Sequence, residues 1–190
     1  IVSHHNFKET PSNLEEIHQR MCNRDPDIVK LVTMANSPED NIRMLELVQK
    51  SKVPTVGFCM GETGLISRIL TGKYGAPFTY ATFSRERALA PGQLAFEDMQ
   101  RVYQYDDIDE KTEVYGVLGD PVAHSLSPLI HNKAFRAAGL NNVYLPFHVK
   151  PELFEQTLEQ FRWLDVKGYS VTVPHKVAAL EAADACEHSV

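Results

Sequence analysis

The chain has 190 residues, of which 43% are hydrophobic and 23% are charged, a composition that supports a folded core and excludes an intrinsically disordered chain. With 19 Lys and Arg against 25 Asp and Glu, the formal net charge is −6, which excludes the strongly basic surface of a typical nucleic-acid-binding protein. No apolar run approaches the roughly 18 residues of a transmembrane helix, so we expect no membrane partner.

The beginning of the chain and its cysteines indicate its cellular setting. The first residue is Ile1, and no basic segment followed by an apolar one opens the chain, so we expect no signal peptide and interpret the sequence as a piece of a longer chain. Cys22, Cys59 and Cys186 are widely spaced and odd in number, which fits neither a disulfide framework nor a zinc site. We therefore expect a reducing compartment, the cytoplasm, and no metal.

Short apolar runs alternate with helical patterns through the first part of the chain. We expect strands over residues 1–7, 27–34, 55–60 and 78–83. We expect four helices in this part. One begins at Thr10-Pro11, one is capped by Ser37 before Pro38, one covers residues 64–70, and one contains Phe96, Met99 and Val102. Four βα units in a row predict a parallel sheet with helical crossovers, and they amount to half of an eightfold barrel.

The pattern restarts after an acidic stretch over residues 106–111. In this second part we expect strands over residues 114–118, 143–149 and 169–173. We expect helices over residues 127–138, 151–164 and 176–185, the first of them capped by Ser127 and ended by Gly139. The second part is thus also predicted to be an open α/β layer.

Lys30 lies within the apolar run of residues 28–32, which should be buried on both faces of a parallel sheet. A desolvated lysine has a lowered pKa, and its free amine can form an imine with a ketone. The alternative is a lysine that extends its ammonium into solvent from a strand end. Of His4 and His5, alternation places only His5 on the inner face, where it could move a proton or be a structural histidine.

Two further side chains of the first part are candidates for binding a substrate. Arg68 comes just after a predicted strand, and its guanidinium could bind a carboxylate, although most arginines are simply solvated. Ala90-Pro91-Gly92-Gln93 has the composition of a flexible lid loop with one amide to offer, and equally that of an ordinary turn.

In the second part, polar residues again follow strands. Ser125 and Ser127 precede a helix N-terminus, where two hydroxyls and the helix dipole suit a carboxylate or a polyol, or where either serine could only cap the helix. Thr172 and Lys176 end another strand and could face the same cleft. The sequence contains no Gly-x-Gly-x-x-Gly, so it carries no dinucleotide-binding fingerprint of its own.

The order of the motifs in the first part is specific, whereas each motif alone is not. The motifs cover residues 3–7, 27–30, 64–68 and 90–93. Up to about residue 106 the chain resembles the C-terminal half of type I 3-dehydroquinate dehydratases. The resemblance implies the last four units of a (β/α)8 TIM barrel. It also implies that Lys30 forms an imine with 3-dehydroquinate, that His5 is the general acid and base, and that Arg68 and Gln93 bind the substrate.

The second part resembles the N-terminal, substrate-binding domain of shikimate dehydrogenases. The matching motifs cover residues 115–121, 124–128 and 170–176. The resemblance implies that Ser125 and Ser127 bind the shikimate carboxylate and Thr172 a ring hydroxyl. It implies that Lys176 is the catalytic lysine that handles the proton when NADP, held by a domain outside this sequence, exchanges hydride with the substrate.

Both resemblances together are typical of bifunctional dehydratase–dehydrogenases of the shikimate pathway. They imply that residues 1–108 are the C-terminal half of the dehydratase barrel and that residues 112–190 are an incomplete substrate-binding domain of the dehydrogenase. The implied partners are the small molecules 3-dehydroquinate, 3-dehydroshikimate and shikimate; the dehydratase half needs no cofactor. A plastid is the alternative compartment if the parent chain carries a transit peptide.

Two positions depart from the family patterns. Leu89 stands where the dehydratases usually have Ser or Thr, and Ser170 replaces an asparagine of the dehydrogenases. They leave open an alternative, a non-catalytic or single-activity shikimate-binding module with a degenerate dehydratase site. In either case we expect the isolated 190-residue piece to be inactive.

Overall fold

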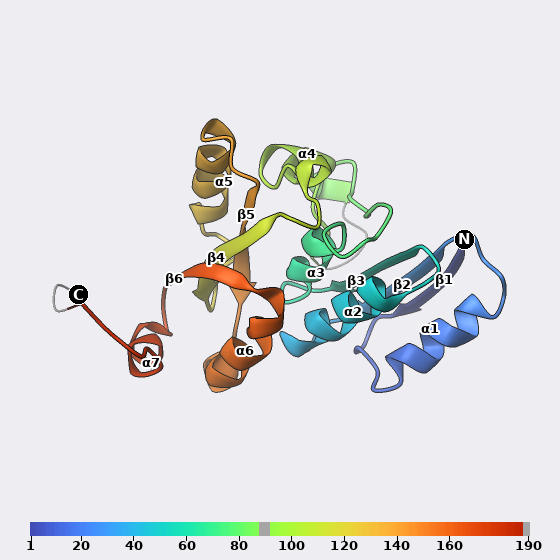
Figure 1. Ribbon diagram of the computed structural model, residues 1–190, viewed down its shortest axis with the longest axis horizontal. Helices are drawn as coiled ribbons and strands as arrows, with labels where there is room; N and C mark the ends of the chain where they lie inside the picture. Colours follow the sequence, from blue (N-terminus) through green and yellow to red (C-terminus); the bar gives the residue numbers. More distant parts are fainter. Residues whose placement is uncertain (88–91, 188–190) are drawn as a thin grey trace.

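The structure is a computed structural model, and it describes residues 1–87 and 92–187. It contains two three-stranded parallel sheets with helices between successive strands (Figure 1). The α/β class with parallel sheets that the sequence predicts is therefore confirmed. Within the described ranges no helix is long and apolar enough to cross a membrane.

The first sheet has the strand order β1-β2-β3 and carries two long helices on one face. Its strands are β1 (Val2–Asn6), β2 (Val29–Met34) and β3 (Thr55–Met60), and its helices are α1 (Leu14–Cys22) and α2 (Glu39–Lys50). Leu14, Ile17 and Met21, which the helical period places on one face of α1, are buried with Leu31 and Met44 in one apolar cluster. A third helix, over Leu65–Leu70, follows β3, so three of the four predicted βα units are confirmed.

Residues 78–83 do not form the expected fourth strand. Thr82 makes only an isolated bridge with Ala95. The carbonyl of Tyr80 accepts a hydrogen bond from Arg68 Nη1 at 3.0 Å, so the segment is bonded to the helix that follows β3 and not to β3 itself. The strand prediction was wrong: the backbone groups of this segment bond to Arg68 and, through Thr82, to Leu94 and Phe96.

The second sheet has the order β5-β4-β6, with its first strand in the centre. Its strands are β4 (Glu113–Gly119), β5 (Asn142–His148) and β6 (Val166–Val171). The remaining α-helices of the described residues are α3 (Leu65–Leu70), α4 (Phe96–Arg101), α5 (Ser127–Ala137), α6 (Phe154–Gln160) and α7 (Lys176–Glu181). The expected alternation of strands and helices is therefore confirmed in this part.

The helix expected over residues 151–164 is divided. A 3₁₀ turn over Pro151–Leu153 precedes α6, and a second one over Phe161–Leu164 follows it. Residues three apart lie on the same side of a 3₁₀ turn, and Phe161 and Leu164 are both buried. Both side chains therefore face the core from this turn.

One apolar core connects the two halves of the chain. It contains Ile69 of α3 together with Leu145 and Phe147 of β5. At the edge of this core Tyr74 stacks on Trp163 of the other half, with ring centroids 4.7 Å apart. Figure 1 shows α6 beside α2, and the two helices are in contact. The two sheets therefore do not behave as independent units joined by a linker.

Substitution Phe147→Ala should lower the free energy of unfolding by about 3–5 kcal/mol, because it leaves a cavity in this shared core. The ring packs against Phe161 and Tyr169, with centroids 5.1 and 5.7 Å away. Urea unfolding followed by the fluorescence of Trp163 measures the change. Leu140→Ala, at a position that is 52% exposed, is the control and should cost less than about 0.5 kcal/mol. Equal losses in both variants would contradict the shared core.

Candidate functional site

Lys30 and His5 lie on the same face of the first sheet. In the parallel register Ser3 is paired with Lys30, and His5 is paired with Val32. Side chains alternate between the faces of a strand, so these four residues share one face. It is the face turned away from α1 and α2, because the neighbouring Leu31 packs against those helices.

The Lys30 side chain is half-buried beneath an aromatic ring. Its Nζ lies 3.8 Å from the centroid of the Tyr80 ring. Burial lowers the pKa of the amine, and the Arg68 guanidinium lowers it further. A lowered pKa increases the fraction of neutral amine near pH 7, which is the form that attacks a carbonyl carbon.

Arg68 is a cation inside the protein, only 2% exposed. Its guanidinium carbon lies 4.2 Å from the centroid of the Phe58 ring, and Nη1 donates to Tyr80 O at 3.0 Å. Burial lowers the pKa of Arg68 to about 10. Its Nε has no hydrogen-bond partner within the described part of the chain. A buried guanidinium with an unused donor is suited to bind a carboxylate.

The residues before Arg68 hold α3 against the end of β3. A Cβ on Gly64 would lie 2.4 Å from Met60 O, so only glycine allows the chain to approach so closely. Ser67 Oγ accepts the Cys59 N–H at 2.8 Å and donates to Gly64 O at 2.9 Å. These bonds place Arg68, one residue later, over the sheet.

His5 lies on the edge strand β1 and is exposed. Its ring stacks on Phe7 with centroids 6.0 Å apart. Partial desolvation lowers the pKa of His5, and the charges of Lys30 and His4 lower it further. The imidazole is therefore neutral near pH 7 and can accept a proton.

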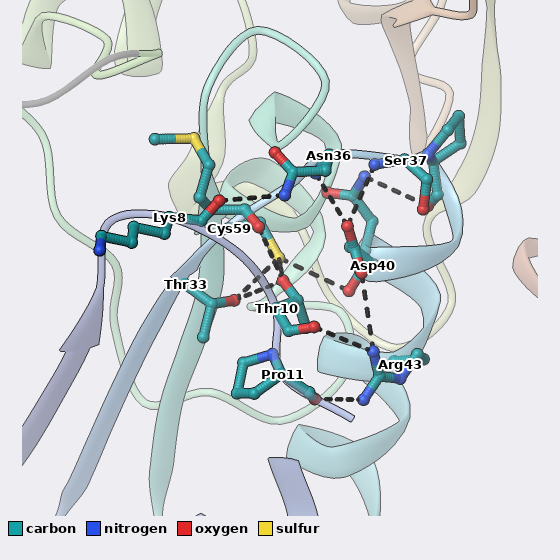
Figure 2. A network of polar contacts seen from close by, with 12 residues as sticks. Lys8, Thr10, Pro11, Thr33, Asn36, Ser37, Asp40, Arg43 and Cys59 are labelled. Atoms are coloured by element: carbon teal, nitrogen blue, oxygen red, sulfur yellow. Dashed lines mark hydrogen bonds and ion pairs between the residues drawn. The ribbon is translucent and has the colours of Figure 1, made fainter. Parts of the chain in front are cut away.

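A polar network holds the loop that follows β1 (Figure 2). Arg43 of α2 donates to Pro11 O at 2.6 Å and to Thr10 O at 3.3 Å. The Thr10 hydroxyl in turn lies 2.8 Å from that of Thr33 at the end of β2. The loop next to His5 is thereby attached to both β2 and α2.

Ser37 does not cap α2 as the sequence predicts. The residue before the helix is Pro38, and no side chain caps it from that position. The Asp40 carboxylate instead accepts the N–H groups of Asn36 at 2.8 Å and Ser37 at 3.1 Å (Figure 2). Asp40 therefore fixes the residues just before α2, and its charge in the first turn is favoured by the helix dipole.

Gln93 lies at the junction of the two halves. A Cβ on the preceding Gly92, which has φ 70°, would be 2.2 Å from Gly61 O, so the backbone packs closely against the end of β3. Gln93 lines a pocket of about 330 Å³ together with Val122 and His148 of the second half. Ala90 and Pro91 of the predicted lid motif lie outside the described residues, and so does Leu89, which departs from the family pattern.

His148 bridges the halves at this pocket. Its Nδ1 lies 3.0 Å from Thr63 Oγ1, and its Nε2 lies 3.0 Å from Asp120 Oδ1. Thr63 precedes α3 and Asp120 follows β4, so the bonds connect the loops beside the two candidate sites. The sequence does not single out His148, although a polar residue that ends an apolar parallel strand is the available signal.

The predicted residues of the second half follow strand ends. Ser125 and Ser127 come after β4, Thr172 comes after β6, and the exposed Lys176 begins α7. Thr172 N–H donates to Leu118 O at 2.9 Å, which continues the pairing of β6 with β4. These side chains lie beyond the carboxyl ends of the parallel strands β4 and β6, which is where α/β sheets usually bind ligands.

Ser127 does not cap α5, contrary to the expectation. It is the first residue of the helix, and its N–H is accepted by Ser125 Oγ at 3.2 Å. Ser125 therefore makes the local hydrogen bond that a cap would make. Ser170, which stands where the dehydrogenases have asparagine, accepts a hydrogen bond on its hydroxyl from Tyr144 OH at 2.7 Å.

Tyr80 belongs to the first site but is not among the residues that the sequence predicts. Phe78 and Tyr80 alternate along the segment and face the apolar cluster of Val32 and Phe58. This alternation was the available signal, but the expectation of a strand there assigned the two rings no role. Within residues 1–87 and 92–187, no group of three or more His, Cys, Asp or Glu could hold a metal ion.

Comparisons with known proteins cover the whole chain. Residues 1–110 match the family model of type I 3-dehydroquinase, and residues 117–190 match that of the shikimate dehydrogenase substrate binding domain. The chain is 40% identical, over 97% of its length and 30% of the relative, to the bifunctional 3-dehydroquinate dehydratase/shikimate dehydrogenase, chloroplastic, of Arabidopsis thaliana. It is 33% identical, over 100% of its length and 39% of the relative, to the shikimate biosynthesis protein AroDE of Chlamydia pneumoniae.

A solved structure, described as dehydroquinate dehydratase and shikimate dehydrogenase from S. pombe AroM, matches at 26% identity and a TM-score of 0.44. The match covers 96% of this chain and 35% of the chain in the solved structure. The chain thus spans about a third of the length of each of these three proteins.

Substitution Lys30→Met should raise the pKa of His5, because it removes an ammonium that opposes protonation of the imidazole. The pKa should stay below the usual value of about 6.5, since the ring remains partly desolvated. An NMR titration of the His5 ring measures the shift. Lys8→Met removes an exposed charge from the following loop and serves as the control. An unchanged His5 pKa in Lys30→Met would show that the two groups do not interact.

Proposed function

Since the chain belongs to the type I 3-dehydroquinase family and continues into a shikimate dehydrogenase substrate-binding domain, we propose that the whole protein carries out both reactions. The first is the dehydration of 3-dehydroquinate to 3-dehydroshikimate, and the second is the NADP-dependent reduction of 3-dehydroshikimate to shikimate. The observation that carries the proposal is the half-buried Lys30 amine with its lowered pKa, on the face that also bears His5 and Arg68.

In the dehydratase reaction Lys30 is the nucleophile. Its neutral amine adds to the C3 ketone, water leaves, and the resulting imine makes the C2 proton acidic. His5, neutral because of its lowered pKa, removes that proton and then gives a proton to the C1 hydroxyl, which leaves as water. Hydrolysis of the imine returns the amine and releases 3-dehydroshikimate.

Arg68 and Gln93 bind the substrate in this scheme. The free Nε of the buried Arg68 is the donor for the substrate carboxylate, whose charge a desolvated guanidinium attracts strongly. Gln93 offers its amide from the junction of the two halves. The first sheet is in this proposal half of a (β/α)8 barrel over residues 1–108, and residues 112–190 begin the dehydrogenase.

In the dehydrogenase reaction this chain supplies the substrate site and a proton. Ser125 and Ser127 bind the carboxylate, Thr172 binds a ring hydroxyl, and Lys176 holds the proton that the C3 oxygen gains or loses. NADP supplies the hydride-transfer chemistry when it is bound. This sequence offers no Gly-x-Gly-x-x-Gly cradle, so we assign NADP to residues outside it.

The alternative is a single-activity or non-catalytic binding module. It is favoured by Leu89 and Ser170, which depart from the patterns of the two families. Ser170 has a structural partner, because its hydroxyl accepts the hydrogen bond of Tyr144 OH. We place the protein in the cytoplasm or in a plastid, the latter by analogy with the chloroplastic relative of Arabidopsis.

Borohydride reduction in the presence of 3-dehydroquinate should attach the reduced substrate to Lys30, in the protein expressed from its complete reading frame. Peptide mapping by mass spectrometry locates the adduct. Lys30→Met should abolish it, and Lys52→Met, which removes an exposed lysine, should retain it. A folded protein without an adduct would exclude the dehydratase and leave the binding-module alternative. The isolated 190-residue chain should turn over neither substrate.

Substitution Ser125→Ala should raise the KM for 3-dehydroshikimate. A hydrogen bond to a charged group contributes about 1.5–3 kcal/mol, which corresponds to an increase of about 10- to 140-fold. NADPH oxidation measured against substrate concentration gives the value. Lys133→Ala, at an exposed position of the helix α5 that follows Ser125, is the control. A KM unchanged by Ser125→Ala would remove this serine from the carboxylate site.

A further inference from the structure

Two cations of the first site rest on aromatic faces. Lys30 Nζ is 3.8 Å from the ring centroid of Tyr80, and the Arg68 guanidinium carbon is 4.2 Å from that of Phe58. The two rings are tilted neighbours, with centroids 6.4 Å apart. Within residues 1–87 and 92–187 neither cation forms an ion pair with a carboxylate.

Hydrogen bonds at Tyr80 and at the preceding residue hold the Tyr80 ring in place. Its carbonyl accepts the Arg68 Nη1 hydrogen bond at 3.0 Å, and the preceding Thr79 donates Oγ1 to Arg68 O at 3.1 Å. The ring itself packs edge-on against Phe78, with centroids 5.7 Å apart. The same arginine that offers its Nε to a carboxylate therefore also fixes the residue that covers the amine.

We propose that Tyr80 is a positioning residue that holds the cationic forms of Lys30 in place through the face of its aromatic ring. The inference rests on the proposed imine chemistry of Lys30. The negative face of an aromatic ring attracts a cation within about 6 Å of its centroid without carrying a net charge. A carboxylate in the same place would also hold the ammonium, but it would repel the anionic substrate that Arg68 is to bind.

The ring acts on two successive cations. The first is the Lys30 ammonium, whose proton must leave before the nitrogen can attack. The second is the iminium: the neutral nitrogen bonds to C3, and the carbonyl oxygen takes one proton from that nitrogen and the one that the ammonium released, and leaves as water. The new C=N bond then places the positive charge on the nitrogen. Both charges arise at Nζ, so a ring placed over Nζ stabilises both. The phenol hydroxyl takes no part in this contact.

The test is the pKa of the Lys30 amine in variants of Tyr80. Tyr80→Phe keeps the ring and should leave the pKa unchanged. Tyr80→Leu removes the ring and should lower the pKa by about half a unit, because an exposed or half-exposed cation–π contact is worth that much. The pH dependence of acetylation by limiting acetic anhydride, read on the Lys30 peptide, measures it in the complete protein.

Two controls belong to this experiment. Phe83→Leu removes a different ring of the same segment, one that is 83% exposed, and should leave the Lys30 pKa as it was. Acetylation of the exposed Lys52 in the same digest reports whether the reagent behaves equally in every variant. Circular dichroism confirms that Tyr80→Leu is folded, and Tyr80→Met is the substitute if it is not.

The outcomes separate this inference from the proposed function. A pKa that falls in Tyr80→Leu and not in Tyr80→Phe supports the role of the ring, whether or not a borohydride adduct forms. Equal pKa values in the native protein and Tyr80→Leu overturn it, even if the adduct is found. A fall of equal size in Tyr80→Phe also overturns it, because the hydroxyl and not the ring would then be responsible.

Discussion

The burial of the Arg68 guanidinium is the constraint on which the first half of the structure depends. A charge removed from water is costly unless other groups replace the lost hydration. Here an aromatic face and one carbonyl do so, at 4.2 Å from the Phe58 centroid and 3.0 Å from Tyr80 O. Residues 78–83 are bonded to Arg68 through Tyr80 O, and the Tyr80 ring lies over Lys30, whose pKa is lowered first by burial and further by the Arg68 charge. One buried cation thus shapes both the backbone and the electrostatics of the site.

The structure also depends on the apolar core that the two halves of the chain share. Apolar residues of α3 and β5 pack together, and His148 bonds to Thr63 on one side and to Asp120 on the other. Gln93 lines a pocket at this junction with residues of the second half. A loop of the first half therefore takes part of its surroundings from the second half.

Much of the fold follows from local patterns. The apolar period of Leu14, Ile17 and Met21 predicts α1, and Gly139 with φ 67° ends α5 as a left-handed glycine should. Other boundaries differ from these patterns. Residues 78–83 bond to Arg68 and not to β3, Pro38 and not Ser37 precedes α2, and 3₁₀ turns flank α6. Propensity decides where an element exists, but distant side chains decide where it ends.

By itself the sequence determined the candidate residues Lys30, His5 and Arg68 and the order of the motifs, because alternation and strand ends are local properties of the chain. It could not determine that Lys30 and Arg68 lie close enough for one charge to lower the pKa of the other, nor that Tyr80 covers the amine. Those facts were decided by the tertiary structure. A pKa depends on burial and on charges brought together from separate segments, and no local pattern contains that information.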